Sequence, residues 1–280
     1  MARTRAFVQV DVFSANSYLG NPLAVVIDGK GIDDDTMARV ARWTGLSETT
    51  FLLPPADPAA DYRVRIFTQR GEIPFAGHPT LGSAHAWLEN GGVPGRADRV
   101  VQECGAGLVE ISRSGGTLAF AAPPVQRSGD LERDYLAQLV AALNIDARQV
   151  VGYQWVDNGP GWAAIRLATA AEVLALEPDF SAIPDANVGV VGAYPIGAEH
   201  AFELRAFAPG AGVFEDPVTG SVNASVAQWL IRTGVAPASY KVSQGTRLGR
   251  TGEINVRAED DGTVWIGGVT TTCFRGEAVI

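Results

Sequence analysis

A chain of 280 residues is about twice the length of a typical domain, which predicts two domains or one large sheet-rich unit. Hydrophobic residues make up 46% and charged residues 19%, with 32 glycines and 16 prolines, so the composition favours a compact, turn-rich globular protein over a disordered chain or a coiled coil. The formal net charge of −9 offers no basic surface to a nucleic acid or an anionic membrane.

The N-terminal segment and the cysteines bear on the compartment. Residues 7–13 contain Gln9 and Asp11 where a signal peptide needs an unbroken apolar core, so no export is predicted. No apolar run approaches the roughly 18 residues of a membrane span. Cys104 and Cys273 can form at most one disulfide, and no His or Cys pair has the spacing of a zinc site. We therefore expect a cytoplasmic protein without a metal and without nucleic-acid or membrane partners.

The first half of the chain is typical of short strands around one main helix. Residues 33–44 have an acidic first turn, apolar residues at helical spacing and a glycine stop, which predicts a first helix. Residues 79–89 carry Leu81, Ala84 and Leu88 on one face, which predicts the central helix. The predicted strands are short β-branched or aromatic runs at residues 7–13, 23–27, 48–53, 62–67, 100–102 and 108–112.

The second half begins after a proline pair. Pro123 and Pro124 end a strand, and a new helix is predicted from Asp130. Residues 218–233 have an apolar stripe and a glycine stop, so they repeat the role of the central helix. The predicted domains are residues 1–123 and 127–280, with the C-terminal strand as an alternative completion of the first domain.

The two halves resemble each other in sequence. The run His-Pro-Thr-Leu-Gly-Ser from His78 aligns with Asp-Pro-Val-Thr-Gly-Ser from Asp216 at a shift of 138 residues, and residues 21–27 align with a segment at the same shift. Arg-Ile-Phe from Arg65 and Arg-Ala-Phe from Arg205 stand 140 residues apart. Three matches in the same order indicate a duplicated unit, and two such copies are expected to face each other across a pseudo-twofold cleft.

The repeated turns have the chemistry of helix starts. In each, His78 or Asp216 precedes proline, the residue favoured at the first helical position. A helix start offers unpaired N–H groups and a positive dipole end, which suits a carboxylate ligand. Simple capping is the alternative interpretation of each turn. If the halves face each other, both helix starts converge on one anion, with His78 and Asp216 interacting directly or through it.

Three side chains near this predicted cavity can exchange protons. Glu48 begins an otherwise apolar strand, and its alternative interpretation is a solvated carboxylate at a strand end. For His78 and Asp216 the alternative interpretation is a helix cap without a catalytic role. His85 and His200 are interpreted as structural or solvated. Together Glu48, His78 and Asp216 form a candidate proton-transfer set, for which burial has to tune the pKa values.

At these residues the chain resembles the PhzF family, named for an isomerase of phenazine biosynthesis. The motifs are residues 47–51 (SETTF), 71–82 (GEIPFAGHPTLG) and 207–221 (FAPGAGVFEDPVTGS), together with Ser243-Gln-Gly and Gly249-Arg250. The resemblance spans nearly the whole chain. It implies an α+β class with the diaminopimelate-epimerase-like fold, in which each of two pseudo-symmetric domains wraps a mostly antiparallel sheet around a central helix.

The resemblance also implies a cofactor-free isomerase, commonly a homodimer, whose founding member moves a proton between carbons of a dihydro-hydroxyanthranilate. By motif position, Glu48 is implied as the proton shuttle, with His78 and Asp216 as its catalytic partners. The implied substrate-binding residues are Ser47, Gly77, Gly220 and Ser221. Related epimerases use two facing cysteines, but the turns of this chain hold His78 and Asp216, so two-thiol racemisation is disfavoured.

The leading hypothesis is a cytoplasmic isomerase that tautomerises a small cyclic carboxylate-bearing substrate with a single glutamate. Two alternatives are kept. One is epimerase or lyase chemistry in the same cleft, and the other is a non-catalytic member of the fold that binds a small molecule.

Overall fold

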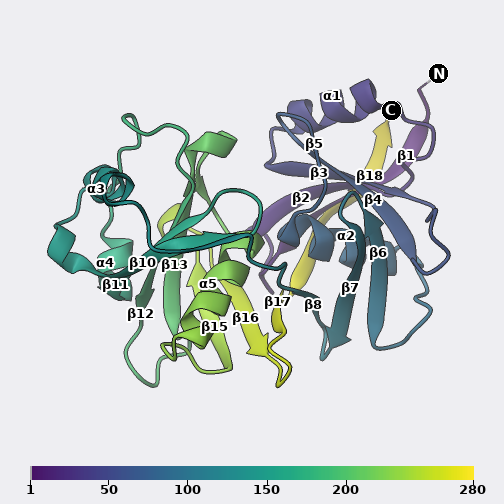
Figure 1. Cartoon of the computed structure of the whole chain (residues 1–280). Coiled ribbons are helices and arrows are strands. Elements are labelled where there is room, and N and C mark those ends of the chain that lie inside the picture. The colour runs from purple at the N-terminus through teal and green to yellow at the C-terminus, as the bar shows by residue number, and fades with distance from the viewer. Residues whose placement is uncertain (1) are drawn as a thin grey trace. The chain divides into compact units, whose positions relative to one another are not determined.

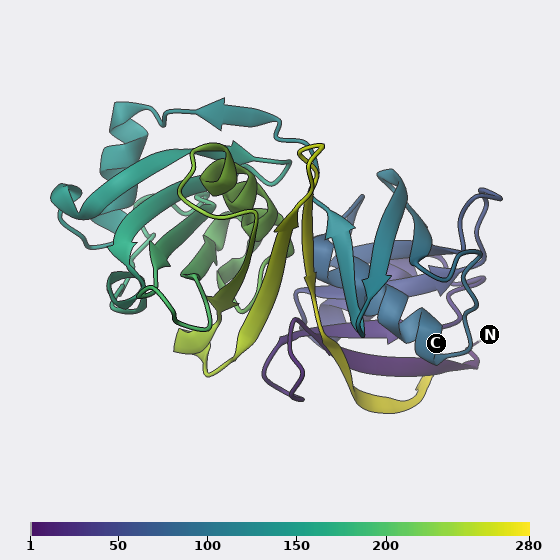
Figure 2. The same ribbon diagram turned by 90° about the horizontal axis from the view of Figure 1, so that it is seen from below.

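The computed structural model describes residues 2–280 and divides the chain into two units (Figure 1). The described residues up to Ala121, together with Gly267–Ile280, form unit 1, and Ala122–Ile266 form unit 2. The sequence-based boundary after residue 123 lies beside this division. The C-terminal strand, whose place the sequence left open, pairs antiparallel with the first strand of unit 1, and Figure 2 shows the two side by side.

Unit 1 is a mixed sheet with two helices. In chain order its elements are β1 (Thr4–Val12), β2 (Asn21–Val26), α1 (Asp34–Thr44), β3 (Glu48–Leu53), β4 (Tyr62–Thr68), β5 (Glu72–Ile73), α2 (Gly77–Glu89), β6 (Arg99–Cys104), β7 (Gly107–Ser114), β8 (Thr117–Ala121) and β18 (Thr270–Val279). The pairs β1–β2, β3–β4, β4–β5 and β6–β7 are antiparallel, whereas β2–β3 and β4–β6 are parallel. The predicted first helix is confirmed as α1, with Asp33 as its N-cap and Gly45 in the left-handed conformation at its end.

Unit 2 has the same kind of elements. They are β9 (Arg127–Gly129), α3 (Arg133–Ala142), β10 (Val150–Asp157), β11 (Ala163–Thr169), α4 (Ala170–Leu174), β12 (Val188–Ala193), β13 (Phe202–Ala208), β14 (Val213–Asp216), α5 (Gly220–Arg232), β15 (Ser239–Gln244), β16 (Gly252–Ala258) and β17 (Val264–Gly268), which leads into β18. Short 3-10 turns occupy Ala147–Gln149, Pro209–Ala211 and Thr246–Leu248.

The strand pairings of the two units follow one pattern. In unit 2, β10–β11, β12–β13, β13–β14 and β15–β16 are antiparallel, and β11–β12 and β13–β15 are parallel, which matches the sequence of pairings from β1 to β7. Each unit also places one helix between its second and third matching strands and its central helix after the short strand, β5 or β14. This is the arrangement expected of a duplicated unit and supports that prediction.

The central helix of unit 1 is buried on more sides than its sequence predicted. All residues of α2 from Gly77 to Ala84 are buried, and the helix packs against β1, β2, β3 and β8. Gly82 makes this approach possible, because a Cβ there would lie 2.6 Å from a methyl group of Leu23. A sheet that wraps around the helix therefore replaces the single apolar stripe expected of a surface helix.

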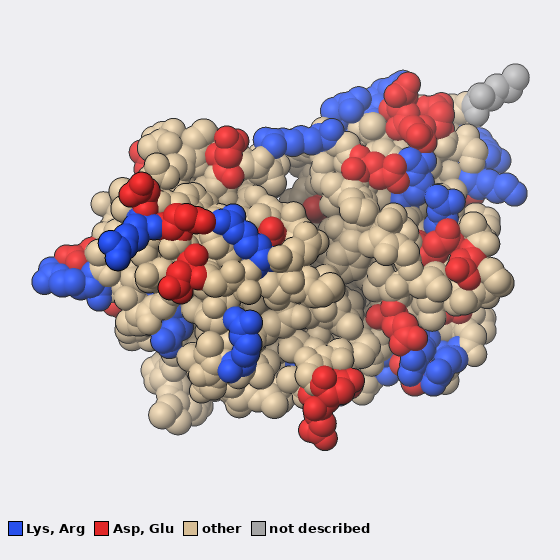
Figure 3. All heavy atoms as spheres, viewed as in Figure 1, with Lys and Arg blue, Asp and Glu red and all other residues tan. Residues whose placement is uncertain are grey.

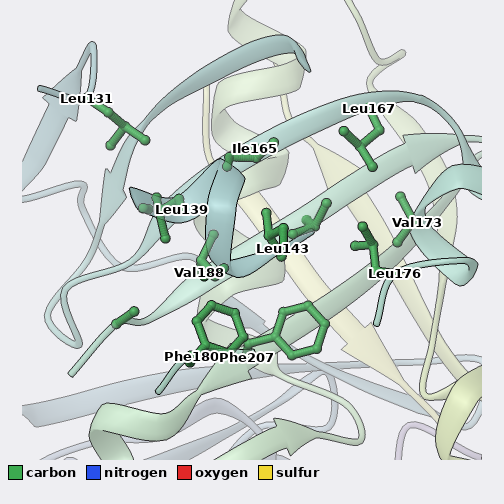
Figure 4. Packing of buried hydrophobic residues seen from close by; sticks show 14 residues of the cluster. Leu131, Leu139, Leu143, Ile165, Leu167, Val173, Leu176, Phe180, Val188 and Phe207 are labelled. Carbon is green, nitrogen blue, oxygen red and sulfur yellow. The ribbon is translucent and has the colours of Figure 1, made fainter. Parts of the chain in front are cut away.

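The sheet of unit 2 is covered on both faces. On one face, Leu139 and Leu143 at the end of α3 pack with Leu167, Val188 and Phe207 of the strands in a buried cluster (Figure 4). On the other face, Gly189 lies against Val222 of α5, with 2.5 Å from its ideal Cβ position to a methyl carbon. Successive strand residues point to opposite faces, so β12 contacts the cluster through one residue and α5 through the next.

The longest helices among residues 2–280, α2 and α5, have 13 residues each, and none of the helices in this range combines the length and apolar character needed to cross a bilayer. Charged side chains of both signs are interspersed on the face in Figure 3, which fits the acidic composition.

In each unit an arginine–glutamate pair joins the short strand, β5 or β14, to its neighbouring strand. In unit 1, Arg65 on β4 donates through Nε and Nη2 to Glu72 on β5, at 2.7 and 2.5 Å. In unit 2, Arg205 on β13 donates in the same bidentate way to Glu215 on β14, at 2.9 and 2.8 Å. The guanidinium carbon lies 5.1 Å from the Phe67 ring centroid in the first case and 4.9 Å from the corresponding phenylalanine in the second. The 140-residue match between Arg65 and Arg205 therefore joins equivalent positions.

The two pairs differ in burial, and this predicts different stability effects. The side chains of Arg205 and Glu215 are 5% and 6% exposed, whereas those of Arg65 and Glu72 are 17% and 42% exposed. Arg205→Met leaves a buried carboxylate without its cation, so we expect a loss of about 3–5 kcal/mol in unfolding free energy. Arg65→Met is expected to cost about 1 kcal/mol or less, because water screens that pair. Urea denaturation of the two variants measures the difference, and equal losses would contradict the burial argument.

Candidate active site

Glu48 is fixed at the start of β3 in unit 1. Helix α1 ends at Gly45, and the chain bends through Leu46 and Ser47 before pairing β3 with β4, where Glu48 lies opposite Thr68. The two threonines that follow are buried and anchored: the Thr49 hydroxyl lies 2.9 Å from that of Thr44, and the Thr50 hydroxyl accepts a hydrogen bond from Ser83 of α2 at 2.9 Å. The motif residues after Glu48 thus join its strand to both helices. Ser47 itself is half-buried in the bend.

His78 is brought against Glu48 by the first turn of α2. His78 Nε2 lies 3.4 Å from Glu48 Oε2, and the two side chains are only 6% and 16% exposed. On the other side of the ring, Asn21 Nδ2 lies 3.4 Å from His78 Nδ1. The structure therefore brings together two of the residues predicted from the sequence and adds Asn21, which the sequence search placed only in the repeat. Its position at the start of β2, opposite Val12 of β1, turns its amide toward the ring.

Burial determines the charge of the imidazole. Loss of hydration lowers the pKa of His78 from 6.5 to about 3, and a hydrogen bond to the backbone carbonyl of Pro22 offsets only part of this effect. The ring is therefore neutral near pH 7. Although its distance to Glu48 falls within the range of a salt bridge, the contact is one between a carboxyl group and a neutral imidazole, because the cost of charging a buried ring exceeds the attraction.

Asp216 ends β14 in unit 2 and is held by its own turn. The Thr219 hydroxyl donates to Asp216 Oδ2 at 2.5 Å, and the side-chain amide of Gln244 donates to the Asp216 backbone carbonyl at 3.0 Å. Thr219 and Gln244 are both buried. Sequence reasoning singled out Asp216 but gave no role to these two neighbours, although both lie in the motifs that carried the family resemblance.

Gly220 and Ser221 open helix α5. Trp162 Nε1 donates to the Ser221 hydroxyl oxygen at 3.0 Å, and Asn158 Nδ2 donates to the Ser221 backbone carbonyl at 2.9 Å. The serine hydroxyl is thus an acceptor toward Trp162, so its single hydrogen can be donated elsewhere. Trp162 carries no motif signal and was missed in the sequence.

The alternative interpretation of His78 and Asp216 as simple N-caps is wrong. Helix α2 begins at Gly77 with Ala76 as its N-cap, and α5 begins at Gly220 with Thr219 as its N-cap. Pro79 lies inside the first turn, where a missing N–H costs nothing, so proline marked the first turn but not its first residue. Asp216 instead stays in the extended strand before its proline. The helix starts align at a shift of 143, which makes His78 equivalent to Ser221 and not to Asp216.

Neither central helix has a side chain that caps its first turn. Within the described range, Ala76 and Thr219 make no side-chain capping hydrogen bond, and the Thr219 hydroxyl points to Asp216 instead. The first N–H groups of α2 and α5, at Gly77 and Gly220, are therefore not used by caps. This keeps the positive end of each helix dipole available to an anion.

A separate group of titratable side chains lies in unit 2. Donor atoms of Glu199, His200 and Glu253 all lie within 4.8 Å of one another, a grouping that spacing along the chain did not indicate. Lys241 Nζ contacts Glu253 at 3.0 Å and Glu199 at 3.4 Å. The lysine thus supplies a positive charge to these carboxylates, so the group is explained as a surface ion-pair network. His85 is likewise paired, with Glu89 at 3.3 Å.

The depressed pKa of His78 predicts a ring that does not titrate between about pH 5 and 8, unlike an ordinary histidine. Because the unfolded ring binds a proton near pH 6.5 and the folded ring only near pH 3, the unfolded state holds more protons in this window. His78 therefore lowers the stability as the pH falls from about 6.5 toward 3. Two-dimensional ¹H–¹⁵N NMR of the imidazole nitrogens measures this, with His78→Gln as the assignment control, and a midpoint near pH 6.5 would refute the neutral ring.

The comparisons with known proteins agree with these motifs. A family model described as phenazine biosynthesis-like protein matches residues 10–279. Antisense-enhancing sequence 1 of Schizosaccharomyces pombe is 35% identical over 98% of this chain and 99% of that protein. A trans-2,3-dihydro-3-hydroxyanthranilate isomerase of Pseudomonas aeruginosa is 34% identical over 91% of each chain.

A solved structure has the same architecture. The crystal structure of a PhzF-family phenazine biosynthesis protein from Bacillus anthracis covers 99% of this chain and 100% of its own, with a TM-score of 0.83 at 21% identity. The predicted α+β, diaminopimelate-epimerase-like fold is confirmed by this likeness. With the family match over nearly the whole length, the chain belongs to the PhzF family of phenazine biosynthesis-like proteins.

Proposed function

We propose that this protein is a cofactor-independent isomerase that moves a proton between two carbons of a small cyclic carboxylate-bearing substrate. The observation that supports it best is the contact between Glu48 and a neutral, buried His78 in unit 1. Relatives named as isomerases, at 34% identity, support the reaction class. The expected homodimer and cytoplasmic location stay predictions.

In this proposal Glu48 is the base and then the acid. Its carboxylate takes the proton from one carbon, the C–H electron pair enters the conjugated π system of the substrate, and the carboxylic acid returns the proton to another carbon. The overall reaction is an isomerisation without a net redox change. A neutral His78 can orient the carboxylate without the strong pKa depression that a cationic partner would cause.

The helix starts are proposed to bind negative charge. The amides at Gly77 and Gly220 open helices without side-chain caps, and Ser221 has a hydroxyl hydrogen to donate. Such donors stabilise a substrate carboxylate and the charge that develops when the proton leaves. That Asp216 and Ser221 act on the same substrate molecule as Glu48 stays a prediction of the sequence.

The first substrate to test is trans-2,3-dihydro-3-hydroxyanthranilate, from the name of the Pseudomonas relative. Other cyclic and aromatic carboxylates form the wider screen. Deuterium incorporation from heavy water reports proton transfer whatever the final product, and product stereochemistry separates isomerisation from epimerisation. Absence of exchange with every compound would favour a binding protein.

Glu48→Gln keeps the size of the side chain and removes the base, so turnover is expected to fall by about 100-fold or more while the fold survives. Glu103→Gln is the matched control, because Glu103 also lies on a strand of unit 1 and its side chain is 18% exposed, close to the 16% of Glu48. The measurement is the deuterium exchange rate at saturating substrate, with circular dichroism as the fold check.

An exchange rate of Glu48→Gln that stays near that of Glu103→Gln would remove Glu48 from the mechanism. A rate that falls equally in both variants would point to a general effect on unit 1 and also count against the assignment.

The cysteines are expected to be dispensable. Cys104 ends β6, where burial raises the pKa of its thiol, and Cys273 lies on β18, so neither belongs to a helix start. A raised pKa leaves the nucleophilic thiolate scarce near neutral pH. The double variant Cys104→Ser/Cys273→Ala is expected to exchange deuterium within about threefold of the wild type, because neither thiol takes part in the proposed proton transfer. Inhibition by a thiol reagent that this variant abolishes would overturn the expectation.

A further inference from the structure

The amide of Gln244 organises the turn that carries Asp216. Gln244 lies at the end of β15 and is fully buried. Its Nε2 donates to the Asp216 carbonyl at 3.0 Å and to the Thr219 hydroxyl oxygen at 2.9 Å. Its Oε1 accepts from the Thr219 amide at 3.0 Å and from Asn223 Nδ2 at 2.7 Å. One side chain therefore uses two donors and two acceptor positions within a single turn.

These contacts fix the direction of the Thr219 hydroxyl. Its oxygen accepts from Gln244, so its only hydrogen is left for Asp216 Oδ2, 2.5 Å away. The chain of donation runs from the Gln244 amide through the Thr219 hydroxyl to the Asp216 carboxylate. Hydrogen bonds in such a chain polarise one another and hold a buried network in one arrangement.

Unit 1 also has a buried glutamine beside its central helix, but at another register position: Gln102 lies opposite Tyr62 of β4, whereas Gln244 lies opposite Leu204 of β13. Gln102 on β6 donates to the Thr80 hydroxyl at 3.0 Å and accepts from the Tyr62 hydroxyl at 2.8 Å, and it is fully buried as well. Thr80 is the fourth residue of α2, as Asn223 is of α5. Both glutamines thus tie a central helix to the neighbouring strand, but only the Gln244 network continues to a carboxylate.

We infer that Thr219 and Gln244 are positioning residues that hold the Asp216 carboxylate in one orientation for the reaction. This inference rests on the proposed function in that Asp216 takes part in catalysis. It assigns a role to the Thr219 hydroxyl, which makes no capping hydrogen bond to α5. A carboxylate that can rotate about its bond presents its oxygens to the substrate only part of the time, which slows the chemical step more than it weakens binding.

The test compares hydroxyl removal with hydroxyl retention at Thr219. Thr219→Val keeps the shape and removes the donor, and Thr219→Ser keeps the donor. Thr233→Val is the control, because Thr233 is the C-cap of α5 as Thr219 is its N-cap, and its hydroxyl donates to helix carbonyls of Trp229 and Leu230. The full-length proteins are assayed with trans-2,3-dihydro-3-hydroxyanthranilate, or with whichever screened carboxylate the wild type exchanges.

For Thr219→Val we expect kcat to fall about 10- to 100-fold with KM within about threefold, and for Thr219→Ser and Thr233→Val we expect both constants within about threefold of the wild type. Gln244→Glu, which lacks the donating amide, is expected to follow Thr219→Val. Crystal structures of Thr219→Val and Thr219→Ser are expected to show a rotated or doubled Asp216 carboxylate in the first variant only.

The outcomes separate the inference from the proposed function. If the wild type exchanges deuterium and Thr219→Val retains its kcat, the positioning role is refuted. An equal loss in Thr219→Val and Thr219→Ser would assign the effect to packing and refute it as well. If the wild type exchanges none of the compounds, the proposed function fails, and an unchanged Asp216 carboxylate in the Thr219→Val crystal then refutes the inference without any activity.

Discussion

A single constraint governs both units: the central helix begins in the interior, so its first turn has to be tied to the sheet without side-chain caps. A buried glutamine meets this need in each unit, with Gln102 bonded to Thr80 at 3.0 Å and Gln244 bonded to Asn223 at 2.7 Å. Breaking such a bond leaves a buried polar group without a partner, which costs about 1–3 kcal/mol. The positions of Gly77 and Gly220 depend on these ties, and so do the side chains around them. The sheet therefore sets the position of the first turn of each central helix.

The two helix starts carry different chemistry. At equivalent positions unit 1 has the His78 ring and unit 2 has the Ser221 hydroxyl, and only the first lies against a carboxyl side chain that begins a strand. A neutral imidazole and a hydroxyl are both hydrogen-bond donors without charge. Under the proposed function Glu48 is the single acid–base group, whereas a racemase needs two bases. Two units with the same order of strand pairings thus present different groups at their helix starts.

Much of the fold could be predicted because the strands and α1 have strong local signals. The acidic first turn and Gly45 gave both ends of α1 within one residue. The predicted starts of α2 and α5 were each wrong by two residues, because Pro79 lies at the third position of α2 whereas Pro217 precedes the N-cap of α5. The alignment at a shift of 138 residues matched similar amino acids that do not occupy equivalent backbone positions. The alignment of Arg65 with Arg205, at a shift of 140, matched residues that form the same ion pair in both units.

The candidate site was predictable as a set of residues but not as a network. Glu48 and His78 belong to strong motifs, yet their contact depends on where β3 and α2 meet, which sequence spacing does not encode. Asn21 lies in the repeat and Gln244 in a family motif, but only their burial and hydrogen bonds in the structure show what each side chain does.

The pairing of β18 with β1 also has a consequence for synthesis on the ribosome. The strand β1 is synthesised long before its partner Thr270–Val279, so at typical elongation rates the edge of β1 waits of the order of tens of seconds. The strands of unit 2 are contiguous along the chain and are complete before β18 is translated. Unit 1, with Glu48 and His78, can therefore complete its sheet only after the whole of unit 2 has been synthesised.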